Sequence, residues 1–243
     1  MDKKNGYTTR KLPPSINVVT YTDSRYFKLL HSEDLSPVVL DDIINELEEL
    51  NLKLRSFFQR PKGIIFIFIF PDQETYHLFS FEKQMPRWFL GSGSYGEVKV
   101  IDPSFADKLG RTYEFMIQTV KHELVHVFTC FEKNKATLFY EGVATYFAGQ
   151  KFLPEINSWM SDTNKDLTKI FYTDYENAEF PKAGGYIFSY TVIEYIIDKY
   201  GEDKLQEYFL SQDIEPYNIL KVKKDDFISN WKEWLLKTYG GDA

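Results

Sequence analysis

The residues with the clearest chemical potential lie in the stretch His122-Glu123-Leu124-Val125-His126, where two histidines flank a glutamate. Residues four apart on an α-helix lie one turn apart on nearly the same face, so both imidazoles can bind one ion. Glu123 then lies at the edge of that face, where its carboxylate can take a proton from water. Two neutral histidines, a carboxylate and an open coordination position are typical of zinc-dependent hydrolysis. The alternative is a surface helix with two solvated histidines, although only four histidines occur in the chain.

A third ligand is available in the next apolar segment, residues 138–147, whose spacing predicts a second helix. Glu141 falls on its first turn and could complete a His2Glu zinc site with one position left for water. Gly142 would let the backbone approach the first helix, and Ala144 would keep the contact thin. The alternative for Glu141 is a solvated acid that the helix dipole favours.

The two segments together resemble the peptidase MA-like gluzincins, in which an HExxH helix is followed by a Glu-Gly-x-Ala-x-Tyr helix. This chain has Glu141-Gly142-Val143-Ala144-Thr145-Tyr146 at that place. The resemblance extends from about residue 16 to the C-terminus, strongly over the two motif helices and loosely elsewhere. It implies an α+β, zincin-like fold with a thermolysin-like zinc peptidase core. We expect a flexible arm over 1–15, an N-terminal α/β subdomain with a mixed sheet over 16–131, and a C-terminal helical subdomain over 132–243.

The resemblance also implies a role for each residue of the site. His122, His126 and Glu141 would bind Zn2+, and Glu123 would be the general base that deprotonates water and passes the proton to the leaving amine. Gluzincins often add a donor to the oxyanion, and Tyr186 matches the tyrosine that does so.

Two features of this site stay open. Tyr190, one turn after Tyr186, is the nearest alternative donor, and a Tyr186 that only packs is also compatible with the sequence. Thr145 stands where some gluzincins place an acid that orients a ligating histidine. Asp162, Asp166 or a backbone carbonyl could take that part.

Residues 97–101 predict a strand that stops at Asp102-Pro103. The preceding 91–96, Gly-Ser-Gly-Ser-Tyr-Gly, matches the glycine-rich loop of protein kinases, but the rest of the kinase machinery is absent. We therefore interpret 91–96 as a flexible turn leading into the strand. By resemblance to gluzincins, the strand is the sheet edge that holds an extended substrate by β-augmentation, and an ordinary edge strand is the alternative. The candidate substrate-binding residues are Glu97, Val98, Lys99 and Val100.

Composition limits the classes of function. The chain has 243 residues, enough for one large domain or two small lobes that share a cleft. An aromatic content of 17% indicates a large aromatic core or a roomy apolar cleft. A net charge of −7 argues against non-specific nucleic-acid binding. The resemblance to gluzincins implies that the partner is a peptide or protein substrate. The oligomeric state is open.

Compartment is indicated only weakly. The single cysteine, Cys130, excludes an internal disulfide and is expected to be a small buried thiol. The longest apolar run, 64–70, is strand length and too short to span a membrane. The N-terminus lacks a signal peptide, which predicts a cytoplasmic protein if this terminus is native, or a secreted or cell-surface one if a leader was removed.

Other elements follow from periodicity. Strands are predicted over 16–21 and over 64–70, the second buried on both faces at the sheet centre. An amphipathic helix follows Pro37, and we expect the acids on its outer face to be solvated. A short helix carrying a surface His77 follows Pro71. Residues 151–182 are irregular but packed through Trp159, Ile170, Phe171 and Tyr172, and helices are predicted to end at 200 and to cover 202–211 and 225–238.

Three hypotheses of function compete. The first is a zinc metallopeptidase, with the lack of an exopeptidase anchor motif favouring an endopeptidase. The second is a catalytically inactive peptide-binding or regulatory module that keeps the fold, and the third is a metal-free helical protein. An intact Glu123 favours the first, because binding alone has no use for a general base.

Overall fold

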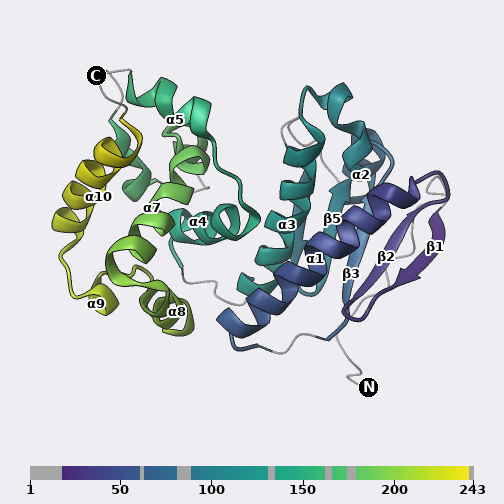
Figure 1. Ribbon diagram of the computed structural model, residues 1–243, viewed down its shortest axis with the longest axis horizontal. Helices are drawn as coiled ribbons and strands as arrows, with labels where there is room; N and C mark the ends of the chain where they lie inside the picture. The colour runs from purple at the N-terminus through teal and green to yellow at the C-terminus, as the bar shows by residue number, and fades with distance from the viewer. Residues whose placement is uncertain are drawn as a thin grey trace.

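The structure is a computed structural model. It describes residues 18–60, 63–80, 89–130, 135–161, 166–173 and 179–240, without the side chains of 18–21 and 80. It is a mixed α+β chain with one five-stranded sheet and mostly helical content (Figure 1). In the described part every strand precedes residue 102 and only helices follow residue 135, although a division into subdomains at 131/132 stays a prediction. The predicted arm, 1–15, lies outside the described residues.

The sheet contains β1 (Val18–Asp23), β2 (Phe27–Ser32), β3 (Ile65–Phe70), β5 (Glu97–Ile101) and β4 (Gly91–Ser94), in that spatial order. β2, β3 and β5 are parallel, whereas the outer strands β1 and β4 are antiparallel to their neighbours. The predicted strand over 16–21 corresponds to β1, which extends to Asp23, and residues 16 and 17 lie outside the described residues.

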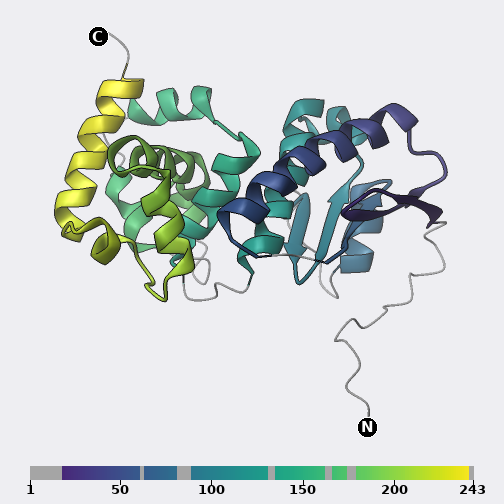
Figure 2. The same cartoon turned by 60° about the horizontal axis from the view of Figure 1, so that its bottom comes forward.

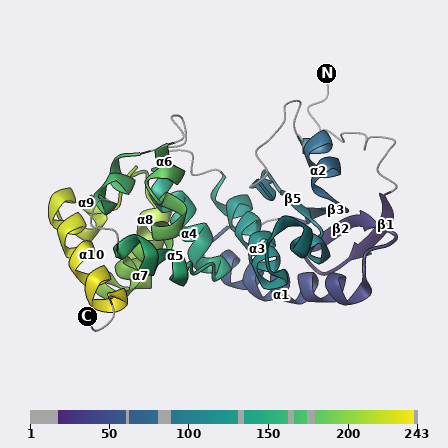
Figure 3. The same ribbon diagram turned by 90° about the horizontal axis from the view of Figure 1, so that it is seen from above.

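β3 lies at the centre of the sheet, as its unbroken apolar sequence predicts. Helices α1 (Pro37–Phe57) and α3 (Tyr113–Thr129) cover one face, and α2 (Gln73–Ser80) covers the other (Figure 3). The isoleucines of β3 are buried, but Phe66 and Phe68, on the face that the short α2 covers, are half-buried. The prediction of burial on both faces is therefore confirmed for one face and only partly met on the other.

α1 packs through one apolar stripe, which its helical spacing predicts. Its outer acids are not all simply solvated. The Tyr113 hydroxyl donates to Asp42 Oδ2 at 2.8 Å, and Lys121 Nζ lies 2.6 Å from Glu46 Oε2. The expectation of a purely solvated face was wrong for these two, because α3 brings polar partners alongside α1.

The strand over 97–101 is not a sheet edge. β5 pairs with β3 on one side and with β4 on the other, so its backbone groups have ladder partners on both sides. The prediction that Glu97, Val98, Lys99 and Val100 form the substrate-binding edge is therefore wrong. The edge beside α3 is β4, from the segment that we had interpreted as a flexible turn. The turn proper is Tyr95-Gly96, where both residues have positive φ.

The remaining helices are mostly where periodicity places them. Trp231 in the last helix is fully buried, and its indole donates to Thr191 Oγ1 at 3.2 Å. Tyr172, predicted to pack, is 63% exposed. None of the helices in the described part is long and apolar enough to cross a membrane. The elements are η1 (Pro103–Leu109), α4 (Thr137–Ala148), α5 (Leu153–Met160), η2 (Leu167–Tyr172), α6 (Glu179–Lys182), α7 (Gly185–Tyr200), α8 (Glu202–Leu210), α9 (Tyr217–Leu220) and α10 (Lys224–Tyr239).

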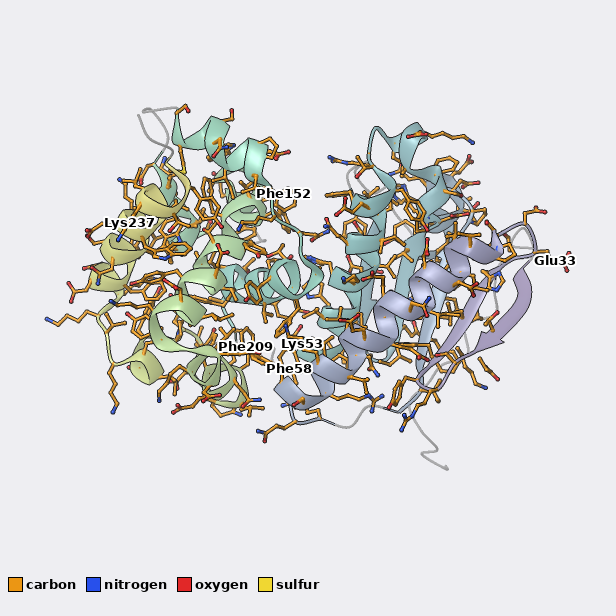
Figure 4. The ribbon with its side chains drawn as sticks, viewed as in Figure 1. Glu33, Lys53, Phe58, Phe152, Phe209 and Lys237 are labelled. Carbon is orange, nitrogen blue, oxygen red and sulfur yellow. The ribbon has the colours of Figure 1, made fainter. Side chains whose placement is uncertain are left out.

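The sheet-bearing part and the helical part lie side by side along the long axis, with α10 and β1 at opposite ends (Figure 2). Aromatic rings join the two parts near the end of α1. Phe58 lies 5.8 Å from Phe209 of α8, ring centroid to centroid, and Phe57 lies 5.0 Å from Phe147 of α4 (Figure 4). This contact holds α4 against α3, which is the arrangement that the site requires.

Candidate metal centre and cleft

The first half of the site comes from α3. Thr112 begins this helix by accepting a hydrogen bond from the Phe115 N–H at 3.1 Å. The helix packs between the sheet, α1 and α4, so its C-terminal half is buried. His122, Glu123 and His126 lie in that half with exposed fractions of 8% or less. The alternative of a solvated surface helix is thus excluded.

The second half of the site is Glu141, on the second turn of α4, which lies against α3 in Figure 1. Its Oε2 lies 3.2 Å from His122 Nε2, and its Oε1 lies 3.4 Å from His126 Nε2. The two Nε2 atoms are 2.9 Å apart. All three ligand atoms therefore fall within 4.8 Å of one another, and Glu141 is buried rather than solvated.

The donor set fits a zinc ion by its own chemistry. Two imidazole nitrogens face each other, and only one hydrogen can lie between them. Among the described residues, no donor is aimed at the buried Glu141 Oε2 with hydrogen-bond geometry. A cation at the centre would satisfy both nitrogens and this oxygen.

The electrostatics agree with that interpretation. Burial acts to raise the pKa of Glu141, but His126 and His122 outweigh it and lower the pKa to about 2. Burial acts to lower the pKa of His122, but the adjacent carboxylate of Glu141 outweighs it and raises the pKa. The Glu141 carboxylate and the His122 imidazole therefore each favour the charged form of the other.

Gln150 is a site residue that the sequence did not indicate. Its Oε1 lies 2.8 Å from His122 Nδ1 and accepts a hydrogen bond from it. This bond keeps the proton on Nδ1 and directs the Nε2 lone pair towards Glu141 and His126. Gln150 follows the end of α4, where Gly149 in the left-handed region (φ 74°) turns the chain back.

Among the described residues, neither Thr145 nor Asp166 forms a hydrogen bond with the histidines. Thr145 donates to the carbonyls of its own helix, Glu141 O at 3.0 Å and Gly142 O at 2.9 Å. Asp166 caps η2 by accepting from the Thr168 N–H at 3.0 Å, and Asp162 lies outside the described residues. The neutral amide of Gln150 takes the orienting part.

We expect Gln150→Ala to weaken zinc binding by about 10- to 100-fold, because outer-sphere partners of ligating histidines have effects of that size. Competition with a chromogenic chelator measures the change. Gln118→Ala is the control, since the Gln118 amide donates to the neighbouring Gly149 carbonyl at 3.2 Å instead of bonding a histidine nitrogen. Unchanged affinity in Gln150→Ala would show that this amide does not support the ligand.

Glu123 lies against β4 rather than in open solvent. A Cβ on Gly91 would come within 2.7 Å of Glu123 Cγ, and a Cβ on Gly93 within 1.8 Å of the Glu123 carbonyl oxygen. Burial raises the pKa of Glu123, against the opposing effects of His122, His126 and the Gly93 N–H. The two glycines therefore let the strand touch the helix at the residue expected to be the general base.

Gly93→Ala is expected to lower the free energy of unfolding by about 3 kcal/mol, because an overpacked contact between two backbones cannot relax by side-chain rotation. Urea unfolding measures the change. Gly63→Ala is the control, since no atom lies within 4 Å of its added Cβ. Equal stabilities of the two variants would contradict the contact between β4 and α3.

A cleft of about 550 Å³ opens over the metal centre. Its walls include Gly91–Gly93 of β4 and Tyr186 of α7. Burial and the charges of Glu141 and Glu123 raise the pKa of Tyr186. Tyr190 points elsewhere, with its ring 5.3 Å from that of Tyr146. Geometry therefore favours Tyr186 over Tyr190 as a cleft donor.

The structure also bears on the expectations for Gly142, Cys130 and His77. Gly142 does not serve the approach of α4 to α3, because an added Cβ there would lie 2.8 Å from the Ser189 carbonyl oxygen of α7. It is α7 that requires the glycine. Cys130 is a buried free thiol, as expected, and its Sγ accepts from the Tyr95 N–H at 3.3 Å. His77 is half-buried beside the Phe89 carbonyl.

Comparison with known proteins gives limited information. No protein-family model matches the chain, and no curated protein matches it. Among solved structures it is similar to an M1 zinc metallopeptidase from Deinococcus radiodurans, with 10% identity and a TM-score of 0.42. A point mutant of that enzyme matches with 11% identity and a TM-score of 0.43. Both matches cover 93% of this chain and 52% of the other, so this chain spans about half their length. Similarity at this level does not assign an activity.

Proposed function

We propose that this chain is a zinc-dependent metallopeptidase of the gluzincin type, with a zincin-like fold, acting as an endopeptidase on peptide or protein substrates. The observation that carries the proposal is the convergence of His122, His126 and Glu141 within 4.8 Å, in a cleft that Glu123 also lines. Three ligands that leave a position open are typical of catalytic rather than structural zinc.

The chemistry divides between the ion and the side chains. When bound, zinc would supply Lewis-acid polarisation of the substrate carbonyl and acidify a water molecule. Glu123 takes the proton of the attacking water and transfers it to the amine nitrogen as the peptide bond breaks. Gly91 packs against the Glu123 side chain and Gly93 packs against the Glu123 backbone, so that β4 limits the rotation of this side chain.

Tyr186 is the proposed donor to the oxyanion. A tyrosine hydroxyl is protonated at neutral pH, so Tyr186, which lines the cleft, can donate a hydrogen bond. We expect Tyr186→Phe to lower kcat about 100-fold, the usual effect of removing one oxyanion donor. Steady-state kinetics measures the change, and Tyr190→Phe is the control. Equal rates of the two variants would remove Tyr186 from the mechanism.

The substrate backbone is proposed to bind along β4. Within the described residues β4 pairs with no strand other than β5, and Gly91–Gly93 line the cleft. An extended peptide on the cleft side of β4 would lie over Glu123, because Gly91 and Gly93 touch this residue. On its opposite side β4 would remain paired with β5.

Zinc content and peptide turnover, measured on the same purified protein, test the proposal. We expect about one zinc per chain, cleavage of a quenched fluorescent peptide mixture, and loss of both in His126→Ala. Zinc without cleavage would leave an inactive peptide-binding module. Failure to take up added zinc would remove the metallopeptidase proposal altogether.

A further inference from the structure

The charge of the cleft is uneven. Among the described residues that line it, the formally charged side chains are Arg111, Glu123 and Glu141. Both acids belong to the metal centre, which leaves one cation for the substrate. Arg111 is exposed and has no carboxylate partner within the described residues. Its guanidinium lies 4.9 Å from the centroid of the Phe115 ring.

Aromatic side chains form the wall beside Arg111. Phe115 lies 6.3 Å from Phe152, ring centroid to centroid, and Phe89 lines the same cleft. Figure 4 shows Phe152 on the side of the helical part that faces α3. A guanidinium stacked on an aromatic ring keeps a fixed plane and its N–H groups remain available.

β4 and α3 run in the same direction past each other. Leu90, just before β4, packs in the cluster that contains Met116. Gly91 and Gly93 contact Glu123, and the Tyr95 N–H bonds Cys130 Sγ. A peptide along β4 therefore follows α3, and its end beside Leu90 points towards Arg111.

The distance between Arg111 and His122 determines how many substrate residues separate the scissile bond from a group bound by Arg111. Arg111 lies just before the N-cap residue Thr112, and the nine residue steps of α3 from Tyr113 to His122 rise about 14 Å. Extended peptide covers about 3.3 Å per residue, and the long arginine side chain shortens the gap, leaving about two to four substrate residues. An antiparallel partner, the more stable arrangement, has its C-terminal side at the Leu90 end of β4.

We propose that Arg111 is a specificity-determining residue that binds a substrate carboxylate on the C-terminal side of the scissile bond, about two to four residues away. This rests on the proposed peptidase function. The carboxylate is either the C-terminus of a short peptide or an Asp or Glu side chain, because a guanidinium pairs equally with both.

Cleavage mapping distinguishes the two sources. An N-acetylated peptide library, made as C-terminal acids and as C-terminal amides, is digested with the wild-type protein and cut sites are located by mass spectrometry. We expect cuts two to four residues before a free C-terminus or before an acidic residue. If amidation of the C-terminus abolishes cleavage, the bound carboxylate is the C-terminus. If amidated peptides that contain Asp or Glu are still cut, the bound carboxylate is that side chain. Acids preferred only before the cut would overturn the proposal.

Arg111→Ala should lower kcat/KM for such peptides by about 10- to 100-fold, through KM, and change it less than about twofold for uncharged amides. Arg111→Lys should recover part of the loss. Lys108→Ala is the matched control, because Lys108 is also an exposed cation stacked on an aromatic ring, at 4.5 Å from Phe105, but lies outside the cleft lining. An unchanged acid preference in Arg111→Ala would overturn the proposal.

A binding measurement separates this proposal from the proposed function. Fluorescein-labelled acid and amide peptides are titrated against Glu123→Gln, with and without Arg111→Ala, by fluorescence anisotropy. If the wild-type protein cuts nothing, the peptidase proposal fails, yet tighter binding of the acid that depends on Arg111 still supports the subsite. Equal binding of the acid and amide peptides would contradict the Arg111 subsite and leave the peptidase proposal unaffected.

Discussion

Glu123→Gln is expected to lower the rate of peptide turnover by about 100-fold to 10,000-fold, while zinc stays bound. The amide has the shape of the carboxylate but cannot accept a proton from water, and it is not one of the three ligands that converge in the site. The measurement is single-turnover cleavage of a peptide that the wild-type protein cuts, beside zinc content by atomic emission.

The control for this change is Glu114→Gln, which alters an exposed glutamate on the first turn of the same helix. It should leave both turnover and zinc unchanged. Glu123→Gln with more than about a tenth of the wild-type rate would assign the proton transfer to another group. Loss of zinc in this variant would instead place Glu123 among the ligands.

Glu141→Ala is expected to reduce zinc affinity by more than about 100-fold, beyond the effect of removing the Gln150 amide. The variant loses a ligand and also the buried negative charge that balances the cation. Zinc content after dialysis against a weak chelator, followed by a competition titration, measures the loss. Turnover should fall with it.

Glu155→Ala, an exposed glutamate on α5, is the control for Glu141→Ala. It should bind zinc like the wild-type protein. Stoichiometric, tight zinc in Glu141→Ala would mean that the two histidines recruit their third ligand from elsewhere. The position of Glu141 between both Nε2 atoms would then be an ion pair only.

The two motif helices were predictable from the sequence because helical periodicity is local, whereas their convergence was expected only from the resemblance to gluzincins. His122, Glu123 and His126 are set by one turn of α3, and the helix ending at Tyr200 is marked by Gly201 at its C-cap. The central strand was also predictable, since an apolar run between Pro and Gly signals has few other interpretations.

What could not be predicted depends on contacts distant in sequence. β4 is rich in glycine and serine, with little intrinsic strand propensity, and it forms because β5 and α3 provide partners on two sides. Gln150 carries no motif and reaches His122 only because α4 turns at Gly149. Gly142 looked like a spacer for α3, but only the structure shows that α7 is its neighbour.

The metal ligands come from both parts of the molecule, whereas Glu123 and β4 belong to one. His122 and His126 lie on α3, and Glu141 lies on α4. Glu123, the proposed proton acceptor, and β4, the proposed binding strand for the substrate, are therefore packed directly against each other through the contact at Gly93. Any movement of the helical part relative to the sheet-bearing part would change the distances between Glu141 and the two histidines. A bound ion would therefore link α3 to α4 across the cleft, in addition to its proposed role in catalysis.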